Sequence, residues 1–233
     1  MTGSGIYLEA MIRESQKHGF SNYRIAGVPA GNIPSLKDRP QTEGACVLFE
    51  SESLNFPVTG MSDVMPYKSS LFKDLKGRRL TSYKSAFTHV LEDAVNQFNP
   101  DIIHTNHLFL LSALVKKLFP TMPIVATCHG TELRQYNNCP HLRRFVKRYC
   151  RGLDKIIALT NDQKRNIHRL YGIPLNQIIV VGGGYDQTMF TRSPKSPAGT
   201  VHILYAGKFN RSKGVPWLLR SLTKIKHHDW HLH

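Results

Sequence analysis

The sequence predicts a doubly wound α/β fold, in which helices cover both faces of a parallel sheet. From about residue 82 onward, predicted helices alternate with short strands made of continuous apolar residues, such as those at 102–103 and 178–181. Continuous apolarity indicates burial on both faces of a strand, as in a parallel sheet. The 233 residues, 41% of them hydrophobic, make about one and a half domains at roughly 150 residues per domain.

The first predicted helix begins at residues 3–5 (Gly-Ser-Gly) and runs to about residue 18, with apolar side chains on one face. A Gly-Ser-Gly turn at the start of a helix normally follows a strand, and here that strand would lie ahead of residue 1. Short strands are expected at 23–26 and 46–49, separated by a proline-rich loop. A second long loop is expected over residues 51–68.

Helices and strands alternate beyond this loop, as they do in a sheet built from βαβ units. Helices are expected at residues 82–98, 107–118, 141–150 and 162–171. Strands are expected at residues 101–104, 123–127, 155–159 and 178–181. Together these elements predict one doubly wound domain.

A second domain is expected to begin after a linker that is rich in Pro and Gly. Its expected elements are a strand at 202–205, a polar loop at 207–214 and a helix at 215–226. One βα unit cannot bury its own apolar face, so we expect only the start of this domain. The expected division is therefore an N-terminal domain at 1–190, a linker at 191–200 and the start of a second domain at 201–233.

The charge of the chain is strongly unbalanced, because 31 Lys and Arg residues face 16 Asp and Glu residues, a net charge of +15. Residues 1–66 carry −2 and residues 67–233 carry +17. Such a field favours anionic partners, which are nucleic acid, an acidic membrane surface or a phosphorylated small molecule. The charge alone does not choose among them.

The four cysteines show no CxxC pairing, and no signal peptide is recognised, so we expect reduced, mostly buried thiols and a cytoplasmic protein. A zinc site from Cys139, His141 and Cys150 would need a spacing that matches no usual ligand pattern. No apolar run reaches about 18 residues, the length needed to span a membrane.

Histidines and small polar residues follow two successive strands of the predicted sheet. His104, Asn106 and His107 follow the strand at 101–104, and the sequence His-Gly-Thr-Glu at 129–132 follows the strand at 123–127. Ligands of open parallel sheets bind at the carboxyl ends of the strands. An imidazole at this edge is suited to donate to a sugar hydroxyl or a phosphate, or to act as a base. The alternative is a pair of structural histidines, with Cys128 pointing into the core.

Two other segments concentrate positive charge. Lys208, Arg211 and Lys213 lie in a loop bounded by glycines between a strand and a helix, which suits phosphate binding, although the loop lacks the order of a P-loop. The helix at 141–150 and the residue after it carry five cations and no acid. These cations are Arg143, Arg144, Lys147, Arg148 and Arg151. A basic amphipathic helix is typical of peripheral contact with an anionic membrane, and a merely solvated helix face is the alternative.

Five short segments, in the right order, resemble the retaining glycosyltransferases of family 4, which have the two-domain GT-B fold. These segments are Pro100–His107, Thr127–Leu133, Asp154–Thr160, Val180–Phe190 and Leu204–Gly214. The resemblance runs from residue 1 to about residue 226. It implies two Rossmann-like domains, of which the first is the acceptor side and the second binds the nucleotide sugar.

The resemblance implies transfer of a sugar from a nucleotide-diphosphate sugar to a carbohydrate, lipid-linked or small-molecule acceptor, with retention of anomeric configuration. It implies no metal and no other cofactor. The residues that it places at the site are His129 against the donor sugar, Gly3, Gly5, Lys208 and Lys213 against the donor diphosphate, and Asn106, His107 and Glu132 in the acceptor-side loop.

The sequence departs from the family pattern in several places. The first strand is absent, Lys208 replaces the usual Arg, and Gly183 replaces the usual Asn of an NG pair. The paired-glutamate motif that holds the donor would lie beyond residue 233. We therefore expect the 233-residue chain by itself to have little or no transferase activity.

Three other functions stay open on the sequence. A nucleotide-sugar epimerase would need a pair of carboxylates near His129, where only Glu132 is available. A non-catalytic nucleotide-sugar-binding protein would need no complete active site. A nucleic-acid-binding module would explain the charge, but it needs aromatic residues interleaved with the cations, and we expect no nucleic-acid partner.

Overall fold

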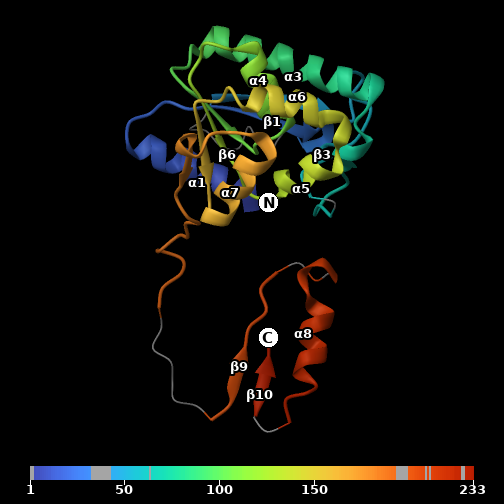
Figure 1. The fold of residues 1–233 in the computed structure, drawn as a ribbon, viewed down its shortest axis with the longest axis vertical. Helices are drawn as coiled ribbons and strands as arrows, with labels where there is room; N and C mark the ends of the chain where they lie inside the picture. Colours follow the sequence, from blue (N-terminus) through green and yellow to red (C-terminus); the bar gives the residue numbers. More distant parts are fainter. Residues whose placement is uncertain are drawn as a thin grey trace. The chain divides into compact units, whose positions relative to one another are not determined.

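The computed structural model describes residues 3–32, 43–62, 64–192, 199–207, 209, 211–226 and 229–233. The chain divides into two compact units, Met1–Gly183 and Gly184–His233. All strand pairs in the described residues are parallel, and helices separate successive strands of the main sheet. The predicted α/β class is therefore confirmed (Figure 1).

The first unit opens with helix α1 (Gly3–Lys17), followed by strand β1 (Tyr23–Pro29) and strand β2 (Glu43–Phe49). A short 3-10 turn, Ala30–Asn32, follows β1. β1 and β2 pair in parallel over seven residues, from Tyr23 opposite Glu43 to Pro29 opposite Phe49. Both strands are longer than predicted, because Gly and Pro positions that suggested loop are tolerated at this two-stranded edge.

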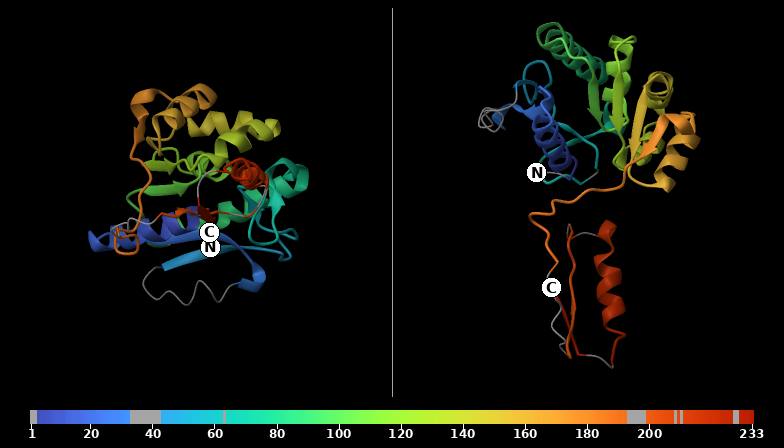
Figure 2. Two further views of the ribbon diagram at one scale, coloured as in Figure 1. Left: turned by 90° about the horizontal axis from the view of Figure 1, so that it is seen from below. Right: turned by 90° about the vertical axis from the view of Figure 1, so that its left-hand side faces the viewer.

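Two helices lie on opposite faces of β1, and alternate residues of the strand contact them. Arg24 pairs with Glu9 of α1, with 2.7 Å between Nη1 and Oε1. On the other face, Tyr23 packs its ring against that of Phe98 at the end of helix α3 (Gly77–Phe98), with 5.4 Å between the centroids. Successive side chains of a strand point to opposite faces of its sheet. Helices α1 and α3 therefore cover opposite faces of the sheet formed by β1 and β2 (Figures 1 and 2).

The segment between β2 and α3 is more ordered than a loop. It contains the paired strands β3 (Thr59–Gly60) and β4 (Ser70–Leu71) and the 3-10 turn Phe72–Asp74. α3 begins five residues before the predicted start, since its first turn is polar and carries no apolar signal. Its buried face holds Tyr83, Phe87, Leu91 and Ala94.

The main sheet has four strands in the order β5-β6-β7-β8, which is also their order along the chain. Its strands are β5 (Ile103–Asn106), β6 (Ile124–Thr127), β7 (Lys155–Ala158) and β8 (Ile178–Val180). Its helices are α4 (Leu110–Leu118), α5 (Thr131–Asn138), α6 (Pro140–Cys150) and α7 (Asn161–Tyr171). α4 packs against α3 and α6, and these three helices lie on one side of the sheet (Figure 1). The strands match the prediction within two residues, whereas α5 is not predicted and α4 begins three residues late.

The core of this unit is an aromatic cluster joined to the buried faces of the main sheet. The rings of Tyr83 and Phe87 lie 4.7 Å apart, and those of Phe72 and Phe109 lie 5.1 Å apart. All four cysteines are free thiols; Cys46 is half-buried and the other three are fully buried. Cys128 points into the core as predicted, and burial raises the pKa of its thiol.

The three groups considered for zinc have separate partners. The thiol of Cys139 lies 3.6 Å from Gln135 Oε1, and the thiol of Cys150 lies 3.7 Å from the carbonyl of Phe109. His141 Nε2 lies 3.1 Å from the carbonyl of Leu75. Within the described ranges, no group of three or more His, Cys, Asp or Glu residues is placed to hold a metal ion.

The second unit contains strand β9 (Val201–Ile203), the 3-10 turn Arg211–Lys213, helix α8 (Val215–Leu222) and strand β10 (Trp230–Leu232). β9 and β10 pair in parallel, so the unit is a βαβ unit rather than the βα unit predicted. α8 ends four residues before the predicted position. Phe209 and Trp217 remain 83% and 71% exposed. In neither unit is a described helix long and apolar enough to cross a membrane.

Candidate functional site

Two histidines meet at the carboxyl edge of the main sheet, where the sequence places a site. His107 directly follows β5, and His129 lies two residues beyond β6. The two strands pair in register, with Asn106 opposite Thr127, so the residues that follow them emerge side by side. The imidazole centroids lie 4.9 Å apart with an interplanar angle of 61°.

His107 adopts a backbone conformation that is uncommon outside glycine, with φ at 85°. Its N–H donates to the carbonyl of Thr127 at 3.0 Å. Its own carbonyl accepts from the backbone N–H of Phe109 at 2.8 Å and from the hydroxyl of Ser112 at 2.6 Å. A strained residue held by three hydrogen bonds at the end of a strand is a mark of a functional site, because such strain persists only where the surroundings impose it.

Glu132 connects the two histidines from the first turn of α5. Its Oε1 lies 2.9 Å from Nδ1 of His107 and also accepts the backbone N–H of His129 at 2.8 Å. Its Oε2 accepts the hydroxyl of Thr131 at 3.4 Å. The side chain is fully buried. It therefore holds the two imidazole-bearing loops together.

Two opposing effects act on the pKa of the Glu132 carboxyl group. Burial alone would raise the pKa of its carboxyl group, but the hydrogen bond and charge of His107 and the backbone N–H of His129 together hold that pKa below its ordinary value. Glu132 is therefore a carboxylate at neutral pH. As a carboxylate it accepts a hydrogen bond from Nδ1 of His107, which holds the ring in one orientation.

His129 is held through Nε2, the other ring nitrogen. Its Nε2 lies 3.0 Å from Oδ1 of Asn106, an acceptor, so Nε2 carries the proton and Nδ1 carries the lone pair. Burial lowers the pKa of His129, and the neighbouring His107 lowers it further, against the opposing charge of Glu132. His129 is therefore neutral at pH 7. The two imidazoles are thus held through different nitrogens, His107 through Nδ1 and His129 through Nε2.

The first turn of α1 belongs to the same edge. The ring of Tyr7 packs edge-on against that of His129, with 5.0 Å between the centroids and an interplanar angle of 79°. Ser4 and Gly5 line a cavity of about 360 Å³ together with Asn106 and His107. The structure thus brings Gly5 of the predicted diphosphate loop to the histidine pair. A Cβ at Gly3 would meet no atom within 4 Å, so this residue leaves open space beside the helix start.

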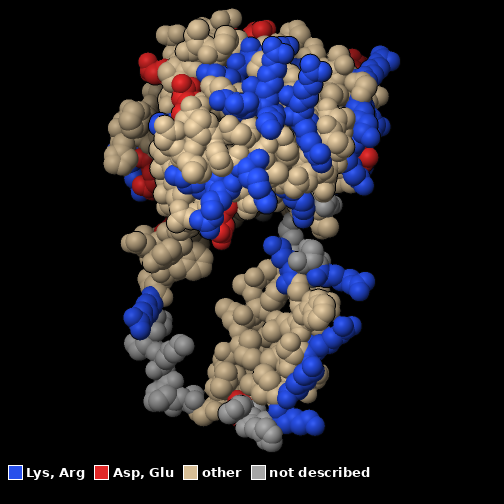
Figure 3. Space-filling view, in the orientation of Figure 1, with Lys and Arg blue, Asp and Glu red and all other residues tan. Residues whose placement is uncertain are grey.

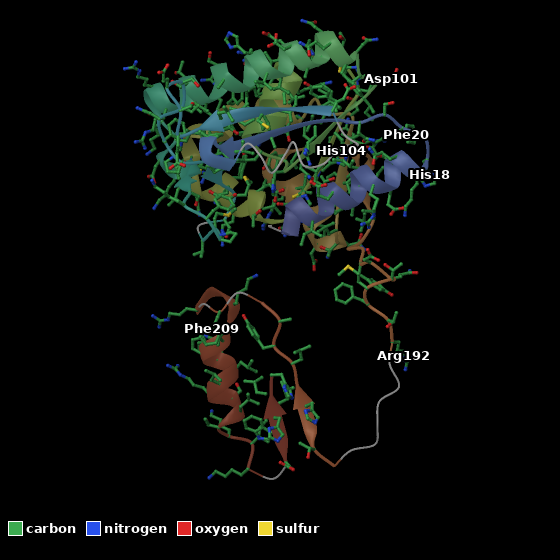
Figure 4. All side chains as sticks on the ribbon, turned by 180° about the vertical axis from the view of Figure 1, so that it is seen from behind. His18, Phe20, Asp101, His104, Arg192 and Phe209 are labelled. Atoms are coloured by element: carbon green, nitrogen blue, oxygen red, sulfur yellow. The ribbon has the colours of Figure 1, made fainter. Side chains whose placement is uncertain are left out.

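The predicted residues of the second unit are only partly described. Lys213 ends the 3-10 turn Arg211–Lys213, directly before the glycine that caps α8. Lys208 lies outside the described residues. In the first unit His104 does not join the pair: it is solvent-exposed, and its Nε2 lies 2.7 Å from the hydroxyl of Thr127. Figure 4 labels His104 and also shows His18 and Phe20 at the distant end of α1.

Four of the five cations on and after α6 line one hollow of about 600 Å³, shared with Gly152. They are Arg144, Lys147, Arg148 and Arg151. Lys and Arg side chains gather on this face of the molecule (Figure 3). Arg143, the fifth cation, does not line this hollow. Its guanidinium turns back and donates to the carbonyls of Tyr136 and Asn137, where it caps the carboxyl end of α5.

Tyr7 is the residue of this site that the sequence does not predict. It sits one turn after Gly3, among residues that read only as the apolar face of a helix. Its contact with His129 depends on how α1 packs beside β6. The role of Glu132 also depends on α5, a helix that the sequence pattern does not predict.

Comparison with known proteins gives three findings. Residues 68–189, just over half of the chain, match Glycosyltransferase Family 4. A D-inositol 3-phosphate glycosyltransferase of Nocardiopsis dassonvillei is 30% identical over 87 residues, which cover 34% of this chain and 20% of that protein. A solved glycosyltransferase structure from Rickettsia africae is 16% identical with a TM-score of 0.53, and the match covers 91% of this chain and 59% of that one.

The Rickettsia africae structure supports the GT-B type of fold. A UDP-GlcNAc 2-epimerase of Neisseria meningitidis bound to UDP-GlcNAc is also similar, at 14% identity and a TM-score of 0.39, over 92% of this chain and 66% of that one. A likeness at that level carries no argument about function. The chain matches less than two thirds of the length of the Nocardiopsis dassonvillei protein and of the Rickettsia africae structure.

Proposed function

Because the chain belongs to glycosyltransferase family 4, we propose that it forms the acceptor side of an enzyme that transfers a sugar from a nucleotide-diphosphate sugar to an acceptor. The observation that carries this proposal is the pair of imidazoles, His107 and His129, held by Glu132 at the carboxyl edge of the sheet. Imidazoles held in one orientation suit recognition of sugar hydroxyls.

We assign the two rings different partners. His129 binds a hydroxyl of the donor sugar near the reacting carbon. His107 accepts a hydrogen bond from the hydroxyl of the acceptor and orients its oxygen for attack. Bonds from Ser112, Phe109 and Thr127 fix the backbone of His107, and Glu132 holds its ring through Nδ1, which supports a positioning role.

The leaving diphosphate needs positive charge that does not depend on the histidines. Lys213 and Lys208 of the second unit and the first turn of α1 at Gly5 are the groups that we assign to it. Cations and helix N-termini stabilise a developing diphosphate charge electrostatically, which contributes several kcal/mol, roughly 3–4 for one well-placed donor. The excess of +17 on residues 67–233 favours such an anionic ligand.

We propose retention of anomeric configuration, by substitution on one face of the sugar. Among the described residues that form the histidine site, Glu132 is the carboxylate, and both its oxygens accept hydrogen bonds from the protein. It is therefore not placed to attack a sugar, which supports a route without a protein nucleophile. The same engagement disfavours the epimerase, which needs a pair of available carboxylates.

The test is a panel of UDP-, GDP- and ADP-sugars offered to the chain, with binding followed by calorimetry. We expect one donor class to bind, and His129→Ala to weaken its binding at least about tenfold. His89→Ala is the matched control, because His89 is an exposed histidine of α3 that bonds only its own helix. Binding of no nucleotide sugar, or equal effects of the two variants, would overturn the proposal.

The basic hollow supports a second proposal, which is contact with an anionic membrane surface. Four cations around one hollow attract anionic headgroups, and Arg143 is excluded from that role because it caps α5. Aromatic stacking of nucleic acid is disfavoured, since Phe145 and Tyr149 pack on each other and against the core.

Vesicle co-sedimentation tests this second proposal. We expect binding that rises with the fraction of anionic lipid and that Arg144→Gln with Arg148→Gln reduces severalfold. Lys73→Gln with Lys76→Gln, which removes the same charge from another exposed part of the unit, should leave binding unchanged. Binding that ignores anionic lipid content would exclude the membrane contact.

A further inference from the structure

Tyr7 stands at the histidine site with a ring and a hydroxyl that have no part in the roles assigned so far. Its ring meets that of His129 in a T-shaped arrangement, with 5.0 Å between the centroids. The ring of His129 also meets that of His107, with 4.9 Å between the centroids. Rings from α1 and from the loops after β5 and β6 thus gather at the carboxyl edge of the main sheet.

The hydroxyl of Tyr7 is available to a ligand. Tyr7 is half-buried, and among the residues that the structure describes its hydroxyl has no hydrogen-bond partner. A buried phenol normally finds one, as Tyr171 does where its hydroxyl donates to the carbonyl of Leu108 at 2.7 Å. In the described part of the chain, the buried side-chain polar atom that lacks a partner is Oε1 of Gln177. The hydroxyl of Tyr7 is therefore accessible rather than buried.

Tyr7 does not face the cavity of about 360 Å³ that lies beside α1. Ser4, Gly5 and Leu8 line that cavity, whereas Tyr7 does not. Successive residues of a helix are rotated by about 100°, so the ring of Tyr7 leaves α1 on another side, toward His129. The surface that Tyr7 offers is therefore part of the histidine site and not of the cavity.

An aromatic ring beside imidazoles suits a sugar. A pyranose carries hydroxyls around its rim and apolar C–H groups on its faces, so it is bound by polar groups at the rim and by an aromatic ring against a face. His129 supplies a polar group, and Tyr7 supplies both a ring and a hydroxyl that donates and accepts. A tyrosine also loses little conformational entropy on binding, because its side chain has two rotatable angles.

We propose that Tyr7 binds the donor sugar, with its ring against an apolar face of the sugar and its hydroxyl bonded to a sugar hydroxyl. This assignment rests on the proposed function, in which His129 binds the donor sugar and Gly5 faces the diphosphate. Gly5 precedes Tyr7 by two residues, about 3 Å along the helix axis. Because the sugar is bonded directly to the diphosphate, it comes within reach of Tyr7 and His129 together.

The experiment uses the nucleotide sugar that the chain binds and the matching nucleoside diphosphate without a sugar. Nuclear Overhauser effects are measured between the ring protons of Tyr7 and the bound ligand, and affinities are measured by calorimetry. We expect contacts from Tyr7 to the sugar protons. Tyr7→Leu should weaken binding of the nucleotide sugar about tenfold and leave that of the nucleoside diphosphate within about twofold, whereas Tyr7→Phe, which keeps the ring, should lose about threefold.

Phe20→Leu is the matched control, because it removes an aromatic ring that is 66% exposed just beyond the other end of α1. It should leave both affinities unchanged. A loss of affinity in this variant as large as in Tyr7→Leu would overturn the assignment, since the effect would then not belong to the histidine site.

Three other results would also overturn the assignment. A nucleobase also packs on aromatic rings, so contacts from Tyr7 to the base instead of the sugar would place the ring at another part of the ligand. Equal weakening of both ligands by Tyr7→Leu, with a lower urea midpoint, would show a structural role. Weaker binding in His129→Ala but not in Tyr7→Leu would refute the assignment and leave the proposed function standing, whereas a parent chain that binds no nucleotide sugar would refute both.

Discussion

Strands β6 and β7 of the main sheet and strand β1 of the sheet formed with β2 differ in how completely they are covered. In the main sheet, Ile124, Ala126, Ile156 and Ala158 are entirely inaccessible to solvent. In the two-stranded sheet every residue of β1 is partly accessible, although the strand is equally apolar in its middle. An apolar strand is therefore buried only where neighbouring elements cover both of its edges and both of its faces. The sequence of the strand itself does not determine whether they do.

The largest expected effect contrasts the buried Ile156 of β7 with the partly buried Ile25 of β1. Ile156→Ala should lower the free energy of unfolding by about 3–4 kcal/mol, because it leaves a cavity in a covered strand. Ile25→Ala in β1 should cost only about 1 kcal/mol, because that side chain is partly accessible and its surroundings can relax. Urea denaturation of the two variants measures the difference. Equal losses would show that the two sheets are covered alike.

A second prediction concerns the buried carboxylate of Glu132 at the carboxyl edge of the main sheet. Glu132→Ala should cost about 3 kcal/mol, because it removes the acceptor of His107 and of the His129 backbone N–H. Glu132→Gln keeps an acceptor oxygen and should lose roughly half as much. If Glu132→Ala unfolds at the same denaturant concentration as the parent chain, the carboxylate does not hold the two loops.

Acid should destabilise the carboxyl edge of the main sheet, because the pKa values of His129 and Glu132 are both lowered in the folded chain. The pKa of His129 in the folded chain lies below its ordinary value near 6.5, so its contribution to stability is complete above that pH and is lost as pH falls. Glu132 adds a further loss below its ordinary pKa of about 4.3. Urea midpoints between pH 8 and 5 should fall, and His129→Asn should flatten that part of the profile. A midpoint that rises toward pH 5 would contradict the neutral state of His129.

The smallest expected effect separates two neighbouring arginines. Arg143→Ala should lose about 1 kcal/mol, since it uncaps the carboxyl end of α5. Arg144→Ala, in the solvent-exposed hollow, should change stability by less than about 0.5 kcal/mol. Thermal unfolding of the two variants distinguishes them, and a loss of similar size for Arg144 would mean that the hollow is part of the packing.

The main sheet was predictable because β7 and β8 are continuous apolar runs, which a pattern search recognises without tertiary information. α5 was not predictable, because its buried side chains include Glu132 and Gln135, which read as solvent-exposed. β10 was missed for a related reason, since His231 stands between its two apolar residues. Burial of a polar residue depends on partners elsewhere in the chain. The pattern of apolar residues in the local sequence does not reveal those partners.

The histidine pair was predictable from strand ends, because parallel strands deliver the residues that follow them to one edge. The strained backbone of His107, the contact of Tyr7 with His129 and the capping role of Arg143 were not predictable. Each of these depends on an atom supplied by a distant segment or on a backbone angle. The residues of a site can therefore be found from sequence, whereas their protonation and orientation require the structure.

The central claim is that His107 and His129, held by Glu132 and Asn106, form one site that faces a nucleotide sugar. Nitrogen-15 NMR of the imidazoles at pH 7 tests it most directly. We predict a proton on Nδ1 of His107 and on Nε2 of His129, and we predict that both rings shift when the bound donor is added while His89 does not. A charged His129, or rings that ignore every nucleotide sugar, would contradict the account.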